Sequence, residues 1–479
     1  MSVSDLSATL QRLALINVCL GQFMTALDSR SIIVALPTIS IHFNSSMAVV
    51  QWIPLAYQLT IIGFVLSLAR LGDIRGRKKN LRIRISAACA RLCVFGSKHR
   101  FMANNRVQGI SRGWRGYGLG QWQGHPVDCL CTTGERPSLG TGLDGVSFGL
   151  YQRPFGCRSS HRYGGLALDF FLNLPVALAA AYMAWKVLPE TPLQRQVHAL
   201  DLPGMLTLFA TAVTLILGLQ QIAKSGVTWL SVVIFTISIG SAVLLLHFEN
   251  KSPAPLLDLS LFKIRVLTAG VLSHLFVVIS HSSTFFLLPF YLQGILHFSP
   301  TQVGVTVIFF SLVIVFLAPL GGWLGDRLGS RLLCTIGSAL SLISMLGFSR
   351  LGADSGYIAV MIPLMILGVG WSIFQAPNLS AIFSAVEPRY VGAVSGISLT
   401  SANIANAMGV AVASVLFLRW LNHYGLDQSG VPPYTQWGEN PAVFIRAFHN
   451  SWLIIAGLTV IAIVASSMRG VDKRQGQGS

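Results

Sequence analysis

Long apolar runs separated by short polar loops recur along most of the chain. Each run is about the length that an α-helix needs to cross the roughly 30 Å hydrocarbon layer of a membrane. The runs are continuous rather than alternating, and a backbone in lipid must satisfy its own hydrogen bonds, so the pattern predicts membrane-spanning helices. Eleven such spans are predicted, at residues 13–36, 50–71, 166–188, 205–222, 229–248, 266–292, 303–324, 332–348, 357–374, 391–418 and 452–468.

Basic residues in the loops predict the orientation of these spans. The loop at 37–48 has no Lys or Arg, whereas the loop after the second span begins with Arg75, Arg77, Lys78 and Lys79. Basic loops stay on the cytoplasmic side of a membrane. We therefore expect a multi-pass protein of the cell membrane with both termini in the cytoplasm, and no cleavable signal precedes the first span.

Residues 70–165 depart from this pattern. They hold 17 of the 34 Lys and Arg residues against 4 acidic residues, so a net +13 of the chain's formal charge of +17 is local. For this reason we do not interpret the charge as nucleic-acid binding. The second span and the span at 166–188 should both end in the cytoplasm, so the chain between them should cross an odd number of times. Three further spans would bring the total to fourteen.

Composition agrees with a membrane protein and argues against an enzyme. The chain is 53% hydrophobic and only 11% charged, whereas about a quarter of the residues in soluble proteins are charged. The seven cysteines lack metal-site spacing. No Walker sequence, nucleophile elbow or H-E-x-x-H motif is present, so we expect no metal, no cofactor and no ATP-driven pumping.

One motif occurs after spans of equal rank in the two halves of the chain. It reads ARLGDIRGRK at 69–78 and GWLGDRLGSR at 322–331. Both copies resemble the G-x-L-x-D-x-x-G-[RK]-[RK] signature of the major facilitator superfamily. Glycine permits a tight turn, and basic residues hold that turn in the cytoplasm. The resemblance implies a cytoplasmic gate formed by Leu71, Asp73, Gly76, Arg77, Gly322, Asp326, Arg327, Gly329 and Arg331.

Three further segments resemble the 14-span drug:proton antiporter branch of this family (EmrB/QacA-type). LDSRSIIVALP at 27–37 is similar to its first-span pattern, FFLNLP at 170–175 to its sixth, and QAPN at 375–378 to its twelfth. The resemblance implies an all-α fold of two six-helix bundles and two linker spans. It also implies alternating access, with export of drugs or amphipathic molecules driven by a proton gradient.

The resemblance also predicts the organisation of the chain. Spans 1 and 2 fall in 1–79, degraded and partly disordered spans 3 to 5 in 80–165, span 6 in 166–190, the linker spans in 203–248, the C-terminal bundle in 266–468 and a cytoplasmic tail in 469–479.

Residues 80–165 match the family poorly, and we hypothesise a frameshift across part of them. RVQG at 106–109 resembles the family's fourth-span R-x-x-Q-G motif with one residue missing. Reading the codons of residues 113–118 one nucleotide later can restore the small residues that follow this motif. The nucleotide sequence tests the hypothesis.

Three residues are candidates for proton coupling. Asp28 lies in the middle of a span, where an ionised carboxylate is costly, and the resemblance makes it the coupling site; a packing contact with Arg30 is the alternative. Arg106 is a second candidate by resemblance, with a solvated loop residue as the alternative. His281 titrates near neutral pH when unperturbed and shares a helix face with His274; an interhelical hydrogen bond is the alternative.

Aromatic and amide side chains in the C-terminal spans are candidates for a substrate cavity, although helix packing explains them equally well. They are Phe285, Phe286, Gln375, Asn378, Asn403 and Asn406. The expected partners are membrane lipid, a small-molecule substrate and, in a two-membrane bacterium, a membrane-fusion adaptor. Two alternatives to drug efflux are export of a native metabolite and a defective product that does not transport.

Overall fold

The computed structural model describes residues 33–41, 45–75, 202–251, 259–387, 390–425 and 440–469. Nearly all of them lie in one compact unit, Gln22–Ile74 with Gln194–Ser479. A helix covers 33–41. The other elements are α2 (Met47–Val50), α3 (Trp52–Arg75), α8 (Leu202–Ser225), α9 (Trp229–Lys251), the 3-10 helix η3 (Leu259–Lys263), α10 (Arg265–Gly294), α11 (Pro300–Leu328), α12 (Ser330–Phe348), α13 (Tyr357–Ser384), α14 (Val391–His423) and α16 (Pro441–Ser467).

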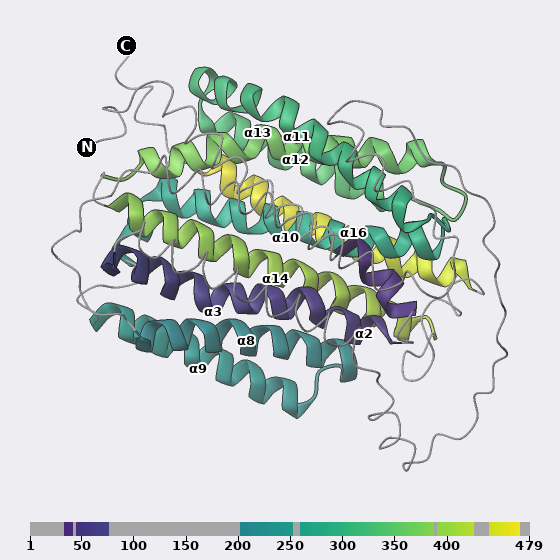
Figure 1. Cartoon of the computed structure of the whole chain (residues 1–479), viewed down its shortest axis with the longest axis horizontal. Coiled ribbons are helices and arrows are strands. Elements are labelled where there is room, and N and C mark those ends of the chain that lie inside the picture. The colour runs from purple at the N-terminus through teal and green to yellow at the C-terminus, as the bar shows by residue number, and fades with distance from the viewer. Residues whose placement is uncertain are drawn as a thin grey trace, which may run out of the picture. The chain divides into compact units, whose positions relative to one another are not determined.

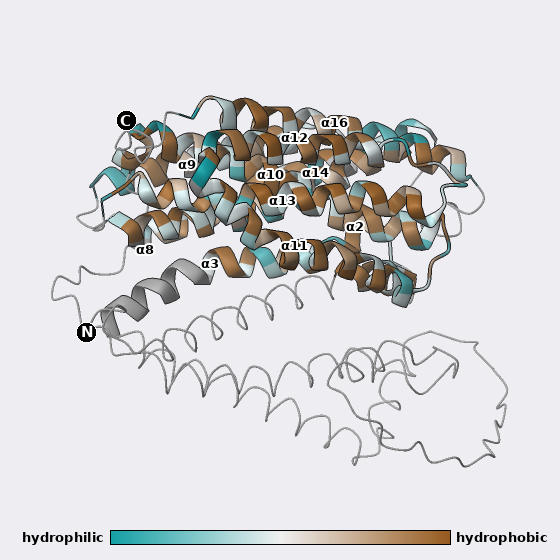
Figure 2. Cartoon of the chain, turned by 90° about the horizontal axis from the view of Figure 1, so that it is seen from above, coloured by the Kyte–Doolittle hydropathy of each residue, from teal (hydrophilic) through white to brown (hydrophobic). Residues whose placement is uncertain are grey.

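Eight described helices, α8 to α14 and α16, are long and apolar enough to cross a membrane. They confirm the eight spans predicted between 205 and 468. The span predicted at 166–188, and all but the end of the one at 13–36, lie outside the described residues. Figure 2 shows that apolar residues dominate the described helices, while polar residues gather toward the helix ends.

Several predicted span ends were wrong. Helix α16 begins at Pro441 and not near 452, and α13 and α14 continue to Ser384 and His423. The predicted span at 50–71 is interrupted by a turn at Gln51, between α2 and α3. Apolar runs mark only the stretch that crosses the hydrocarbon layer, whereas a helix continues for as long as its backbone bonds are made.

Helices α10 to α14 and α16 form the C-terminal bundle (Figure 1). Helix α13 packs mainly on α11 and α12, while α10 packs mainly on α14 and α16. Stacked rings fill the core: Tyr291 and Phe448 have centroids 4.9 Å apart, and so do Phe348 and Trp452. The bundle therefore contains two groups of helices. One group is α11, α12 and α13, and the other is α10, α14 and α16; the contact of α12 with α16 connects them.

The linker helices α8 and α9 form a hairpin whose α8 packs against α14. The Gln51 and Gln220 amides exchange two hydrogen bonds, at 2.6 and 3.1 Å, and so join α8 to the start of α3. Within the hairpin, the Thr211 hydroxyl donates to Ser241 Oγ at 3.2 Å. Polar contacts of this kind hold helices together in lipid, where burial of apolar surface does not.

Candidate functional site

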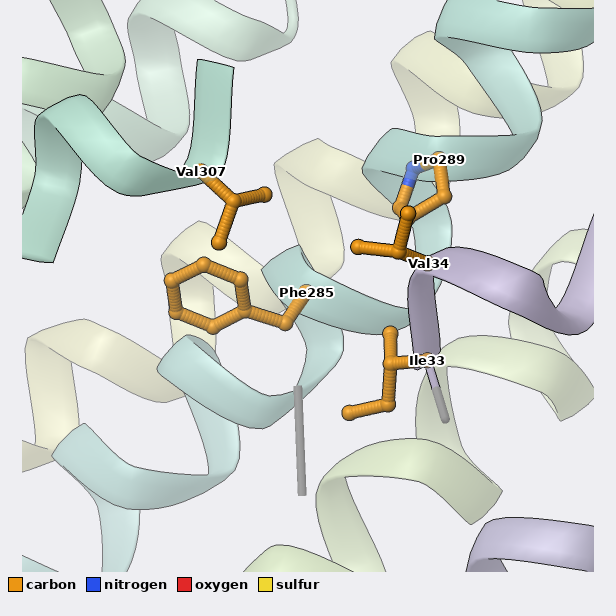
Figure 3. A pocket seen from close by; sticks show the side chains of 5 residues that line it. All are labelled: Ile33, Val34, Phe285, Pro289 and Val307. Atoms are coloured by element: carbon orange, nitrogen blue, oxygen red, sulfur yellow. The ribbon is translucent and has the colours of Figure 1, made fainter. Parts of the chain in front are cut away.

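A small apolar pocket lies between helix 33–41 and the C-terminal bundle (Figure 3). Ile33 and Val34 come from helix 33–41, Phe285 and Pro289 from α10, and Val307 from α11. Its interior leaves no room even for a water molecule, whereas small-molecule sites usually hold about 300 Å³ or more. In this conformation the pocket is too small for a drug-sized molecule, so a substrate would need the surrounding helices to separate.

One amide side chain near the Gly294 end of α10 joins α10 to helix 33–41. Gln293 Nε2 donates to the backbone oxygen of Val34 at 3.1 Å, and the Thr38 hydroxyl donates to Gln293 Oε1 at 3.3 Å. We call these three residues the Gln293 latch. Gln293 follows Pro289 by about one helical turn, so the latch joins helix 33–41 to α10 directly beside the pocket wall.

A buried arginine lies at the opposite end of the C-terminal bundle. Arg469 follows α16 and its side chain is 2% exposed. It donates to Cys334 Sγ at 3.1 Å, to Ser273 Oγ at 2.9 Å and to Asn378 Oδ1. We call these four residues the Arg469 cluster. A buried guanidinium requires several hydrogen bonds to offset its loss of hydration, and here they connect the end of α16 to α10, α12 and α13.

The three predicted site residues on α10 are all buried. Phe285 lines the pocket, and its ring meets Phe310 edge to face at 4.8 Å. Phe286 packs against Phe290, with ring centroids 5.4 Å apart. His281 packs against Trp371 at 4.6 Å. Of the three, Phe285 is therefore the one that the structure brings to the pocket.

The four predicted amides lie away from this pocket wall. Asn378 belongs to the Arg469 cluster, and Gln375 lies beside His274 on the neighbouring helix. Asn403 donates to the Leu399 oxygen of its own helix at 3.0 Å, and the backbone of Asn406 accepts a bond from Ser282. The contacts observed for Asn378 and Asn406 join neighbouring helices, whereas the bond of Asn403 stays within α14.

The second copy of the repeated motif forms the predicted tight turn. Gly329 is the single residue between α11 and α12, and its φ of 83° is in the left-handed region that favours glycine. Arg327 lies over the Trp323 ring at 4.1 Å, and Arg331 is exposed. In the last turns of α11, a Cβ added to Gly325 would lie only 3.0 Å from Pro377 of α13, whereas one added to Gly322 would meet Ala376 at an ordinary 4.0 Å. This copy therefore turns the chain and lets α11 approach α13.

Several predicted site residues lie outside what the structure describes. They are Asp28, Gly76, Arg77 and Arg106, together with the side chains of Leu71, Asp73 and Asp326. Within the described ranges, no group of three or more His, Cys, Asp or Glu side chains is placed to hold a metal ion.

Two important residues were missed by sequence reasoning. Arg469 was assigned to a solvated tail, and Gln293 was not singled out. The available signal was indirect: Ser273 and Asn378 are polar residues within apolar spans, where polar groups usually find partners on other helices.

Comparisons with known proteins agree with a membrane transporter. Residues 161–410 match the family model described as Major Facilitator Superfamily. The riboflavin transporter RibZ of Clostridioides difficile (strain 630) is 27% identical, covering 96% of this chain and 98% of its own. The tetracenomycin C resistance and export protein of Streptomyces glaucescens is 25% identical, covering 84% and 75%. The methyl viologen resistance protein SmvA of Salmonella typhimurium (strain 14028s / SGSC 2262) is 25% identical, covering 85% and 83%.

Proposed function

The chain belongs to the Major Facilitator Superfamily, as a multi-pass secondary transporter and not an enzyme, and on that premise we propose that it exports amphipathic or cationic small molecules in exchange for protons. The observation that carries the proposal is the apolar contact region between helix 33–41 and α10–α11, together with the Gln293 latch that joins helix 33–41 to α10. Two of the relatives are named for export of, or resistance to, a small molecule. An apolar wall with an aromatic ring suits such substrates.

The two hydrogen bonds of the latch support alternating access. We place the Gly294 end of α10 on the external side, because the loop at 37–48 lacks basic residues. Opening the pocket outward would then break two neutral hydrogen bonds, each worth about 1 kcal/mol. Substrate binding or a change of protonation can offset the loss of these two bonds, while the buried apolar contacts of Leu36 must separate as well.

Asp28 is our proposed proton carrier in the first span. It precedes the pocket residue Ile33 by only five positions in the sequence. Protonation of a carboxylate at membrane depth removes a charge that lipid does not tolerate, so it would favour one conformation over the other.

Ethidium accumulation in everted membrane vesicles with an imposed pH gradient tests the proposal. We expect accumulation by the natural chain and its loss in Asp28→Asn. Phe285→Ala should raise the KM, whereas Phe309→Ala, which removes a partly exposed ring of α11, should not. Equal effects of the two ring deletions would reject the pocket as the substrate site.

Riboflavin is a second candidate substrate, because RibZ is similar over nearly the whole chain. Parallel vesicles with riboflavin distinguish this metabolite from a cationic drug. If the natural chain moves neither compound, the non-transporting alternative is favoured.

The latch has its own test. Thr38→Cys combined with Gln293→Cys, joined by a short reagent that links two thiols, should stop transport, and reduction should restore it. Each single-cysteine variant is the matched control. Unchanged transport after verified cross-linking would show that this contact does not need to open.

A further inference from the structure

The first linker helix, α8, packs against both halves of the transporter. Gln51 and α3 belong to the N-terminal half, and α14 belongs to the C-terminal bundle. Figure 1 shows α8 running along both of these helices, with α9 on its far side. A helix that contacts both halves must follow one of them when the halves move against each other.

The contact of α8 with the N-terminal half is a buried pair of amides. Gln51 Nε2 donates to Gln220 Oε1 at 2.6 Å, and Gln220 Nε2 donates to Gln51 Oε1 at 3.1 Å. Gln51 is 2% exposed and Gln220 is 8% exposed. Gln51 Nε2 also donates to the Ala48 oxygen at 2.9 Å, which fixes the orientation of this side chain. Separation of α8 would take both amides from their partners, which is costly for groups buried away from water.

A second contact fixes the register of α8 on α3. A Cβ added to Gly63 of α3 would lie 3.1 Å from the Phe209 ring of α8, so the ring fills the space that a side chain would occupy. Gly63 follows Gln51 by 12 residues and Phe209 precedes Gln220 by 11, which corresponds to about 17 Å along either helix. Two attachments this far apart prevent α8 from sliding or turning on α3.

The contact of α8 with the C-terminal half is apolar. Leu208 of α8 and Leu245 of α9 form a buried cluster, and Ile404 of α14 packs against it. Lipid tails are as apolar as these side chains, so burial of apolar surface does not hold helices together within a membrane. A helix that contacts its neighbour in this way can slide along it at little cost.

One charged side chain of α14 also reaches the linker hairpin. A Cβ added to Gly226, in the turn between α8 and α9, would lie 3.1 Å from Arg419 Nη1. Gly226 has a φ of 72°, in the left-handed region that favours glycine. Arg419 is exposed, and contacts of exposed charges contribute little to stability. This contact therefore holds α8 on α14 less firmly than the amide pair holds it on α3.

We propose that the α8–α9 hairpin moves with the N-terminal half, held by the Gln51–Gln220 amide pair, and that α8 is a sliding seal against α14. When the two halves change position, α8 keeps its place on α3 while its apolar side slides along α14. The seal keeps lipid tails out of the seam between the halves while the substrate path opens. This inference rests on the proposed transport by alternating access.

Two cross-links in the full-length chain test the proposal in everted vesicles. The seven natural cysteines are first replaced by serine. Gln51→Cys with Gln220→Cys then allows a link between α8 and the start of α3, whereas Leu208→Cys with Ile404→Cys allows a link between α8 and α14. A short membrane-permeant reagent that joins two thiols through a reducible bond forms each link. Ethidium accumulation under an imposed pH gradient is measured before linking, after linking and after reduction, and each single-cysteine variant is a matched control.

We expect the α3–α8 link to leave the rate of accumulation within about twofold of the unlinked variant, and the α8–α14 link to lower it about tenfold or more. Reduction should restore the second variant. Loss of transport through the α3–α8 link overturns the proposal, and so does normal transport after a verified α8–α14 link. If the Gln51 pair does not fold, Gly63→Cys with Phe209→Cys forms a link at the other end of the same interface.

A measurement of stability tests the two attachments without transport. Gln51→Leu, Gln220→Leu and their double variant form one cycle, and Leu208→Ala, Ile404→Ala and their double variant form another. Both are unfolded in mixed micelles with increasing denaturing detergent. The amide pair should couple by about threefold or more in the equilibrium constant of unfolding, and the apolar pair by less than about twofold.

The outcomes separate this inference from the proposed function. Equal coupling in the two pairs would overturn the difference in attachment, whatever the transport result. If the natural chain does not accumulate ethidium, the proposed function fails and the sliding seal with it, whereas the two couplings still decide whether α8 is attached to α3.

Discussion

Helices α9 and α10 both cross the membrane by length and composition, yet their surroundings are opposite. Helix α9 is the more hydrophobic of the two. Only 17% of its most apolar stretch is buried, against 83% of that of α10. In α10, buried polar residues such as Ser273, Ser280 and Ser283 lie among buried aromatic residues. Hydropathy therefore indicates contact with lipid, and polar residues within a span indicate contact with other helices.

The face of α9 that contacts other helices is polar in the same way. Its buried residues include Ser231, Ser238 and Ser241, while Val232, Ile239 and other large apolar residues are exposed. In a soluble protein the distribution would be reversed. If burial determines the energetics, substitutions in α9 and α10 should differ in their effects on the free energies of unfolding and of membrane insertion.

The largest difference is expected at two glycines. A Cβ added to Gly409 of α14 would lie 2.6 Å from the Ile279 oxygen of α10, whereas a Cβ on Gly240 of α9 meets no atom of the described residues within 4 Å. The Ile279 oxygen is part of the backbone and cannot move aside as a flexible side chain would. Gly409→Val should therefore lower the free energy of unfolding by about 3 kcal/mol or more. Gly240→Val should cost almost nothing. Thermal unfolding midpoints in one detergent compare them, and equal midpoints would reject the close α10–α14 contact.

A charge on the exposed face of α9 should have the next largest effect. Ile239 lies near the middle of α9 and is 64% exposed. Ile239→Lys places an ammonium in lipid at a cost of about 2.5 to 3.5 kcal/mol on insertion scales, whereas Ile239→Leu is the neutral control. The measurement is the fraction of an α8–α9 hairpin inserted into membranes, scored with engineered glycosylation acceptors. Unchanged insertion of the lysine variant would mean that another part of the protein covers this face.

Much of this fold could be predicted, because crossing lipid imposes a visible length and composition on each span. Eight spans and the turn at Gly329 were predicted from local sequence. Phe285 was a cavity candidate with ordinary helix packing as the alternative; its ring lies beside the small pocket and packs on Phe310, so the cavity role stays a prediction.

The missed features depend on contacts between distant segments. Arg469 follows the last apolar run, where hydropathy predicts solvent, and it is buried because Ser273, Cys334 and Asn378 on three other helices surround it. From sequence, Gln293 is a polar residue at the end of a predicted span, where contact with the membrane interface is expected. Its hydrogen bond to the Val34 oxygen forms only because helix 33–41 lies beside α10. The start of α16 was missed because its first turns carry Arg446, His449 and Asn450.

A smaller effect is expected from one buried hydrogen bond of α10. The Ser280 and Thr459 hydroxyls are 2.7 Å apart, and both residues are buried. Ser280→Ala, Thr459→Val and the double variant form a cycle whose coupling should be about 0.6 kcal/mol and at most about 1.7 kcal/mol. Unfolding in mixed micelles with increasing denaturing detergent measures it. A coupling of zero would remove this bond as a link between α10 and α16.

The smallest effect is expected from the corresponding bond of the α8–α9 hairpin. The single hydroxyl hydrogen of Thr211 is shared between Ser241 Oγ at 3.2 Å and the Thr207 oxygen of its own helix, and the Ser241 hydroxyl donates to the Ser238 oxygen. Thr211→Val keeps the shape and leaves Ser241 with its own acceptor, so the loss should be below about 0.5 kcal/mol in the same micelle titration. Among the described helices, α8 is the one on which α9 packs extensively. Little else in the bundle therefore depends on this bond. If Thr211→Val destabilised the protein more than Ser280→Ala, the hairpin would be a central support of the bundle, and the contrast between α9 and α10 would fail.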